Sequence, residues 1–511
     1  MPAPSASDSL LDNSPEKLTQ LTYLCVLLGA LNETYKSIEN RKYSSGSPIR
    51  DVSLTKFQVF LNLLAQILDT RKGNTTITAL ACLTGPNGAE FVFCSNSRKE
   101  PELEHSKTFL SELLEFVSTN PDQCTAKPLL KQVLWRILAH NSEKLAFYLK
   151  SFSNAVEDCI MNYEEREEAE DPEFSRQLSI FQEKVNFPFD MSSDVFRSRT
   201  LGDCETLIKE IVKSKLTSFL SVVDRQIKDE PPDRSCDWCY LRHYLGRLCS
   251  YREAAEVIAD APNQWGTLFE NFKVRYMPSS PSKRISISPS LNLEQLASGA
   301  FPNRDLSEFD SDIAVLREYG LDDQIRNQVR ILDKKSLVHA EIQLYDYLVR
   351  QGKTLSSGFW DSSAFIATSK PPCRLCHFYF DYSDNNIVIS PPHMNLYPRW
   401  LLPDVKKEEG HEAVMKFNNQ LDEIIEDLQR DTEILLAEKM PVWKRNDSRT
   451  DSYGVSGWSG STGSKPHGGM GHTSRMAGTG DMGGSAFYDP PSSLSSTKSW
   501  HFVNGSNFHG G

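Results

Sequence analysis

Apolar residues recur every three or four positions over most of the chain, which is the spacing of helices with one buried face. The first such stripe consists of Leu18, Leu21, Leu24, Leu28 and Leu31. The same spacing predicts helices over about 16–40, 53–70, 106–118, 128–151, 204–228, 238–260, 310–331, 338–351, 373–382 and 411–438. We therefore expect a chain that is mostly helical.

Four short segments have the composition of strands instead. Residues 76–84 and 89–95 are rich in β-forming residues, and the sequence Gly-Pro-Asn-Gly at 85–88 is typical of a hairpin turn. Residues 363–368 and 386–390 predict two more strands, which alternate with predicted helices. Helices and strands together predict an α/β fold.

Both ends of the chain lack this periodicity. Residues 441–511 contain 14 of the 27 glycines, many serines and no apolar stripe, and residues 1–15 show no pattern either. Segments of this composition bury too little apolar surface to offset the entropy lost on ordering. We expect both ends to be disordered.

The chain has 511 residues, with 56 Lys and Arg against 68 Asp and Glu, and a net charge of −12. This acid excess argues against a protein that binds the nucleic-acid backbone without specificity, because such binding depends on clustered Lys and Arg. The acid excess does not exclude a small site that holds one base or nucleotide.

The sequence argues against a membrane-spanning or secreted protein. The longest apolar run, at 21–31, is shorter than the roughly 20 residues that span a bilayer. Residues 1–17 lack the basic and apolar regions of a signal peptide. The eleven cysteines, most of them single within apolar patterns, are typical of a reducing compartment. We expect an intracellular protein, cytoplasmic or nuclear, without a membrane partner.

Two motifs carry most of the candidate chemistry, His-Ala-Glu at 339–341 and Pro-Cys-Arg-Leu-Cys at 372–376. One imidazole and two thiolates are three good ligands for a tetrahedral Zn²⁺, and the fourth position then remains for water, as in catalytic sites. Zinc lowers the pKa of such a water to near neutrality. Glu341, two residues after His339, is placed to move a proton between that water and a substrate.

The local sequence supports a shared site. A helical pattern begins close to His339 and ends at Gly352, and Pro372 suits the first position of the next helix. Cys373 and Cys376 would then lie on one face of a first turn, where the positive end of the helix dipole favours thiolates. The alternative is two buried cysteines and a histidine that caps a helix.

In the form VHAEIQL and IATSKPPCRLC, the two motifs resemble the cytidine-deaminase-like superfamily. More narrowly, they resemble the OTT-type deaminases, which are related to bacterial toxin deaminases and expanded in fungi. The resemblance covers about residues 335–392. It implies that His339, Cys373 and Cys376 bind Zn²⁺, and that Glu341 shuttles the proton in the hydrolytic removal of an amine from a base.

The resemblance also implies a fold and two further contacts. The family's sheet begins with a hairpin before the His-Ala-Glu helix, so a cytidine-deaminase-like three-layer arrangement of sheet and helices is expected. An Asn at the end of the second strand often faces the substrate in the superfamily, and Asn96 matches this place. Ser369 occupies a position that lines the pocket in relatives. From the residues alone, Asn96 fits a turn and Ser369 fits a strand-end cap.

The expected organisation has six parts. A disordered segment at 1–15 precedes a helical segment at 16–75 and a hairpin at 76–96. A large, mostly helical insertion or companion domain follows at 97–335, then the zinc-binding core with a C-terminal helix at 336–440 and a disordered tail at 441–511. The hairpin is expected to share a sheet with the strands at 363–368 and 386–390. We expect residues that shape the pocket to come from loops within 97–335 and after Ile389.

A second cysteine pair, Cys236 and Cys239, with His243 and Cys249 downstream, superficially suggests a zinc knuckle. However, an apolar helical stripe runs through the same residues. A straight helix would place Cys236 and Cys249 about 20 Å apart, so the four groups cannot surround one metal. We expect a helix here and no metal site.

Two functions from different classes fit these observations. The first is a zinc-dependent hydrolytic deaminase that acts on a nucleobase, nucleoside, nucleotide or nucleic acid. The second is a catalytically silent, zinc-stabilised protein of the same fold, which binds protein partners through its acidic helical body and its tail. The complete set of His339, Glu341, Cys373 and Cys376 favours the enzyme, because a structural site has no need of the carboxylate. The sequence does not identify the substrate.

Overall fold

The computed structural model describes residues 15–38, 54–119, 126–164, 171–229, 236–383, 386–405 and 409–442. Residues 1–14 and 443–511, which make up most of the two ends expected to be disordered, lie outside the described residues. Among the helices of the described ranges, none is both long enough and apolar enough to cross a membrane.

The described helices are α1 (Pro15–Lys36), α2 (Lys56–Leu68), α3 (Glu100–Thr119), α4 (Ala126–His140), α5 (Ser142–Glu164), α6 (Pro172–Val185), α7 (Asp194–Ser214), α8 (Phe219–Asp229), α9 (Asp237–Gln264), α10 (Gly266–Glu270), α11 (Leu293–Ala300), α12 (Asp310–Glu318), α13 (Leu321–Leu332), α14 (Ala340–Arg350), α15 (Arg374–Asp381) and α16 (Gly410–Glu438). The strands are β1 (Thr78–Gly85), β2 (Gly88–Ser95), β3 (Phe272–Tyr276), β4 (Leu337–Val338), β5 (Phe365–Thr368), β6 (Val388–Ile389) and β7 (Trp400–Leu401).

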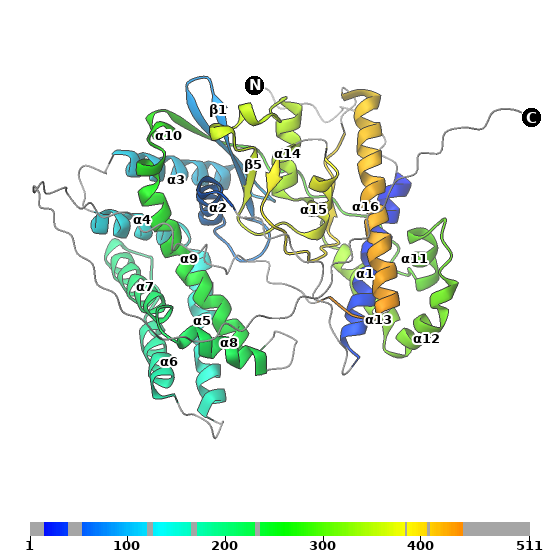
Figure 1. The fold of residues 1–511 in the computed structure, drawn as a ribbon, viewed down its shortest axis with the longest axis horizontal. Coiled ribbons are helices and arrows are strands. Elements are labelled where there is room, and N and C mark those ends of the chain that lie inside the picture. The colour runs from blue at the N-terminus through cyan, green and yellow to red at the C-terminus, as the bar shows by residue number, and fades with distance from the viewer. Residues whose placement is uncertain are drawn as a thin grey trace, which may run out of the picture. The chain divides into compact units, whose positions relative to one another are not determined.

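Five of these strands form one mixed sheet in the order β3-β2-β1-β5-β6 (Figure 1). The hairpin β1-β2 is antiparallel, and β1 also pairs antiparallel with β5, where Leu80 lies opposite Ala367. β3 and β6 add parallel edge strands. The Ser369 hydroxyl accepts a hydrogen bond from the backbone N–H of Thr78, 291 residues away in the chain. The hairpin and the strand between the two motifs are therefore direct neighbours.

Gly88 explains why the hairpin turn fits against the edge of the sheet. Its φ of 137° is a conformation that glycine adopts freely. A Cβ at this position would lie only 1.9 Å from the backbone oxygen of Asn271, just before β3. The next residue, Ala89, donates a backbone hydrogen bond to that same oxygen. The turn therefore also positions β3.

Both faces of the sheet are buried, because alternate residues of each strand enter different cores. Leu80, Phe91 and Phe93 belong to one core, together with α2 to α5 and α9. Ala81 and Val92 belong to the other, together with α1, α13, α14 and α16. The result is a three-layer α/β arrangement of helices, sheet and helices (Figure 1).

The segment 97–335 contributes to both helical layers. Its helices α3 to α9 belong to the layer that includes α2, and among them α3 contacts β3, whereas α11 and α13 pack against α1 on the other side. It also supplies the edge strand β3, which the sequence pattern did not predict. This strand joins the sheet in parallel to β2 and has no hairpin turn that would mark it in the sequence.

Three of the predicted helices are each two helices in the structure. The pattern at 128–151 is broken at Asn141, whose side chain donates to the backbone oxygen of Ile67. The pattern at 204–228 is broken after Ser214, where α7 ends. The pattern at 310–331 is broken at Gly320, which has a φ of 88°. Single long helices were therefore wrong here, because local periodicity continues across a turn that tertiary contacts impose.

Candidate metal centre

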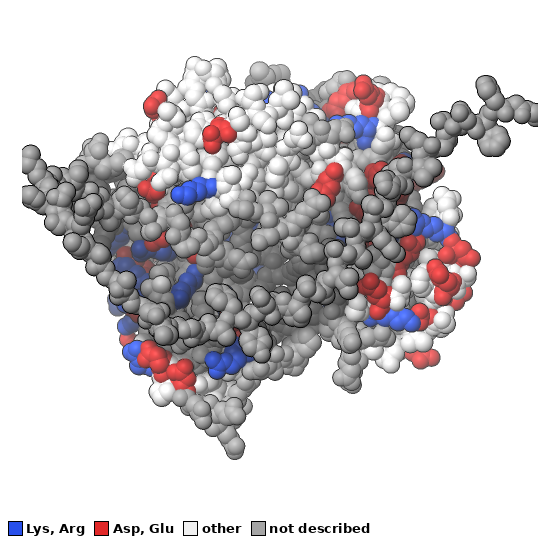
Figure 2. Space-filling view, viewed as in Figure 1, with Lys and Arg blue, Asp and Glu red and all other residues white. Residues whose placement is uncertain are grey.

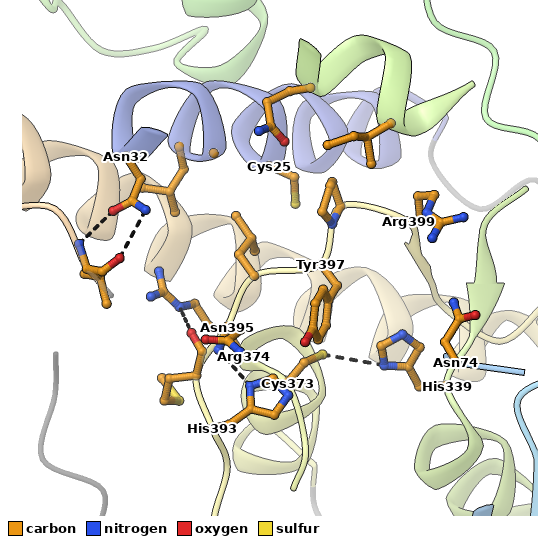
Figure 3. Close-up of a pocket in the computed structure, with 18 of the residues that line it drawn as sticks. Cys25, Asn32, Asn74, His339, Cys373, Arg374, His393, Asn395, Tyr397 and Arg399 are labelled. Carbon is orange, nitrogen blue, oxygen red and sulfur yellow. Dashed lines mark hydrogen bonds between the residues drawn. The ribbon is translucent and has the colours of Figure 1, made fainter. Parts of the chain in front are cut away.

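His339, Cys373 and Cys376 come together in the structure. Figure 3 shows His339 and Cys373 side by side. The Nδ1 atom of His339 lies 3.6 Å from the Sγ atom of Cys373 and 3.3 Å from that of Cys376. The two sulfur atoms are 3.5 Å apart. In a tetrahedral zinc site, with Zn–N near 2.0 Å and Zn–S near 2.3 Å, ligand atoms lie about 3.5 to 3.8 Å apart. The three side chains thus have spacings that fit a zinc ion.

Two helix starts hold these ligands. His339 is the residue that precedes α14, and Cys373 is the residue that precedes α15, both with extended backbone. Cys376 follows in the first turn of α15. Pro372 therefore lies before the helix and not at its first position. The positive ends of both helix dipoles point toward the ligands, which favours thiolates.

The protonation states of the ligands depend on one another. Burial alone would raise the pKa of Cys373, but hydrogen bonds from Cys376 and the charge of His339 lower it well below its usual value. The pKa of His339 is raised, since the attraction of the Cys373 thiolate outweighs burial. Burial raises the pKa of Cys376 well above its usual value. A metal ion binding here would displace protons from His339 and Cys376.

Glu341 lies beside the metal ligands and lines the same cavity. Its side chain is only 5% exposed, and its Oε1 atom is 4.0 Å from His339 Nδ1. Burial raises the pKa of Glu341 above its usual value. A buried carboxyl group with a raised pKa next to a metal site is suited to accept and donate a proton.

Trp400 contributes a contact that the sequence analysis missed. Its indole N–H donates to the Sγ atom of Cys376 at 3.2 Å, and both side chains are buried. Hydrogen bonds to a metal-binding sulfur orient the ligand and tune its charge. Nothing in the local sequence marks Trp400, because β7 reaches the ligands only through its pairing with β4.

The cavity at the metal centre has a volume of about 670 Å³, within the range of small-molecule sites. Its lining includes His339, Glu341 and Cys373. The walls come from α1, the loop before β1, the segment between β6 and β7, and α16 (Figure 3). The segment after Ile389 thus shapes the cavity as expected. From 97–335, the cavity takes residues of α13 and the short connection to β4.

Tyr397 stands beside the ligands in this cavity (Figure 3). Its ring centroid lies 6.4 Å from that of His339 and 5.5 Å from that of His393. Arg374 supports this segment, because its Nε atom donates to the backbone oxygen of Met394. An aromatic ring of this kind offers an apolar face to a planar base. Sequence reasoning missed Tyr397.

Asn96 lines the cavity, but protein groups occupy both ends of its amide. Its Oδ1 atom accepts from the backbone N–H of Ala340 at 2.7 Å, and its Nδ2 atom donates to the backbone oxygen of Asn74 at 2.9 Å. Asn96 therefore links the start of α14 to the loop before β1. The structure places Ser369 differently, since it is buried between β5 and β1 and is not part of the cavity lining.

The second cysteine pair lies at the start of α9. Cys236 accepts a hydrogen bond from the backbone N–H of Cys239, and their sulfur atoms are 3.1 Å apart. Within the described ranges, the group of histidine, cysteine and acidic side chains close enough to hold a metal is that of His339, Cys373 and Cys376. The pair at α9 is not part of such a group.

A histidine, two cysteines and a glutamate at the starts of two helices match the residue signature of zinc-dependent deaminases. Residues 338–404 match the family described as OTT_1508-like deaminase, which supports a deaminase-like protein. Comparisons with curated proteins and with solved structures gave no match.

Proposed function

We propose that the protein is a zinc-dependent hydrolytic deaminase that acts on a base-containing substrate. The position of Glu341 carries this proposal. Its buried carboxyl group lies next to the three ligand atoms and lines a cavity large enough for a small molecule. A site that served only to stabilise the fold would gain nothing from a buried carboxyl group at this place.

The residues of the chain have distinct roles in the proposed reaction. His339, Cys373 and Cys376 would hold a Zn²⁺ ion, and such an ion would supply an acidified water as the nucleophile. Glu341 would carry one proton of the water to the ring nitrogen of the base. It would carry the other proton to the amine, which leaves as ammonia while the water oxygen takes its place on the ring carbon. Tyr397 lies where it would pack against the base.

The change Glu341→Gln tests this role. The amide keeps the shape of the side chain and the metal ligands but cannot transfer protons. We expect zinc content to remain at one per chain and ammonia release to fall by at least about 100-fold. Zinc is measured by elemental analysis. The rate of ammonia release is measured with substrates that contain cytosine or adenine, both as free molecules and within polymers.

The matched control is Glu112→Gln, an exposed position on α3 that should keep full activity. Wild-type turnover by the Glu341→Gln variant would refute the mechanism. A zinc-loaded wild-type protein that releases no ammonia from any of these substrates would favour the silent, zinc-stabilised scaffold.

A further inference from the structure

The charges inside the cavity differ from those of the whole chain. The basic residues of its lining are Lys36, Lys72, Lys335, Lys370, Arg374 and Arg399, and the acidic ones are Glu33, Glu341, Asp431 and Glu438. Two ion pairs form among them, Lys36 with Glu33 at 2.8 Å and Arg374 with Asp431 at 3.1 Å. Basic residues outnumber acidic residues in this lining, although the whole chain carries a net charge of −12.

Three of these basic residues, Lys335, Lys370 and Arg399, come from segments next to the metal ligands, and we call them the basic group. Lys335 and Arg399 precede the paired strands β4 and β7, where the N–H of Leu337 donates to the backbone oxygen of Arg399. Lys370 follows β5, and its charge acts on both His339 and Asp69. The basic group therefore gathers on the side of the cavity that holds the metal ligands.

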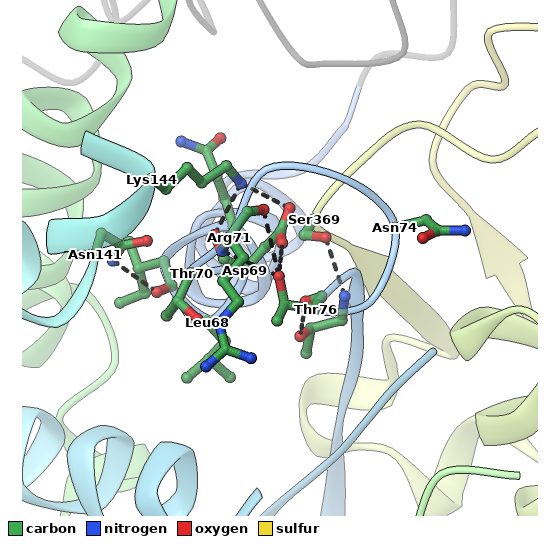
Figure 4. Close-up of polar contacts among 12 residues, drawn as sticks. Leu68, Asp69, Thr70, Arg71, Asn74, Thr76, Asn141, Lys144 and Ser369 are labelled. Atoms are coloured by element: carbon green, nitrogen blue, oxygen red, sulfur yellow. Dashed lines mark hydrogen bonds and ion pairs between the residues drawn. The ribbon is translucent and has the colours of Figure 1, made fainter. Parts of the chain in front are cut away.

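The loop before β1, which forms another wall of the cavity, is fixed from the opposite side by buried polar contacts (Figure 4). Lys144 of α5 forms an ion pair with Asp69 at 2.7 Å, with side chains only 3% and 1% exposed. Thr76 donates to the same carboxylate at 2.6 Å, and Asn96 holds the backbone of Asn74. A loop held in this way loses little entropy when a ligand binds.

We propose that the basic group binds a phosphate of the substrate, so that the protein acts on a mononucleotide and not on a free base or nucleoside. This inference rests on the proposed deaminase function. Ammonium and guanidinium groups bind phosphate oxygens through charge-assisted hydrogen bonds. The cavity volume of about 670 Å³ fits a base, a sugar and one phosphate.

A mononucleotide fits the surface better than a nucleic-acid strand does. On the face shown in Figure 2, the described Lys and Arg residues are interspersed with Asp and Glu and do not form a continuous basic track. A strand requires such a track, because each bound phosphate needs a nearby positive charge. The acid excess of the chain also repels a long polyanion.

The experiment measures binding by calorimetry to zinc-loaded Glu341→Gln protein, which keeps the ligand without turnover. The probes are cytidine, CMP, adenosine, AMP and a ten-nucleotide single strand of each base. We expect one of the monophosphates to bind about 10- to 100-fold more tightly than its nucleoside. In this background, Lys335→Ala, Lys370→Ala and Arg399→Ala should each weaken binding of the monophosphate and leave binding of the nucleoside unchanged. Lys107→Ala, on α3 and outside the cavity lining, is the control.

Equal affinity for a nucleoside and its monophosphate would overturn the inference, and so would tighter binding of the ten-nucleotide strand. Loss of nucleoside and monophosphate binding to the same extent in the three variants would also overturn it, since that result indicates damage to the cavity. Ammonia release by the wild-type protein from nucleosides alone would support the deaminase and refute the phosphate site. Phosphate-dependent binding without ammonia release would support the phosphate site and refute the proposed deaminase function.

Discussion

Single residues outside the two motifs complete the candidate metal centre. Trp400 donates to Cys376, and Asn96 fixes the backbone of Ala340 at the start of α14. The motifs themselves predicted the three side chains that come together and the neighbouring Glu341, because chemistry of this kind requires particular residue types at close spacing. The hydrogen-bond partners of Trp400 and Asn96 could not be predicted from the sequence, because each hydrogen bond depends on which strands become neighbours.

We expect Trp400→Phe to weaken zinc binding by about 10- to 100-fold, as changes to groups that support a metal ligand generally do. Phenylalanine keeps an aromatic ring in the core but removes the N–H that Cys376 accepts. Competition with a zinc chelator measures the affinity.

The control is Trp135→Phe, which removes an indole N–H donated to Glu205, a residue outside the metal centre. Zinc affinity of the Trp400→Phe variant equal to that of the wild type would show that this hydrogen bond has no part in holding the ligand.

Among the elements, the junction of α4 and α5 shows why periodicity alone predicted one helix where two exist. The break places Asn141 and Lys144 against the end of α2, where they bind the backbone oxygens of Ile67 and Asp69. These contacts satisfy backbone groups that would otherwise be buried without partners. The apolar stripe continues on both sides of the break, so periodicity alone hides the helix-start signal in which Asn141 and Ser142 precede Glu143.

We expect Lys144→Met to destabilise the protein by about 3 to 5 kcal/mol, because it leaves the Asp69 carboxylate buried without its ion-pair partner. Urea or thermal unfolding measures this loss. Lys150→Met, an exposed position on the same helix, should change stability little. A small effect of Lys144→Met would mean that the carboxylate finds another partner.

The pH dependence of stability checks the same ion pair. Burial alone would raise the pKa of Asp69, but Lys144 and the hydrogen bond from Thr76 lower it below its usual value. The stabilisation is therefore present above the unfolded pKa of about 3.9 and is lost as pH falls through the lower folded value. The wild type should lose this contribution on acidification, whereas the Lys144→Met variant should lack it at every pH.

For the whole molecule, the two cores depend on one shared sheet. Alternate residues of β1, β2 and β5 enter opposite cores, so neither helical layer has a sheet of its own. The pairing of the hairpin with β5 agrees with the shared sheet expected from sequence, since the region near the motifs contains no other hairpin. The position of β3 and the packing of α1 on α16 could not be read from local patterns, because both are contacts between distant segments.

We expect removal of zinc by a chelator to lower the melting temperature of the whole described unit by more than about 5 °C. The reason is that a metal ion that binds only the folded state stabilises the entire cooperative unit. Far-ultraviolet circular dichroism and tryptophan fluorescence should shift together. The Cys373→Ser variant, which lacks one ligand, should not respond to the chelator. Separate transitions from the two probes would contradict a shared sheet.

The ribosome synthesises the hairpin long before β5, the strand with which β1 pairs. About 280 residues separate the end of β1 from the start of β5, so a ribosome adding about 5 to 20 residues per second makes β5 some 14 to 56 s after the hairpin. During that time the β5-facing edge of the hairpin is open to other nascent chains. The segment 338–404, expressed alone, would keep β6 beside β5 but leave the β1-facing edge of β5 without a partner, and we expect it to aggregate.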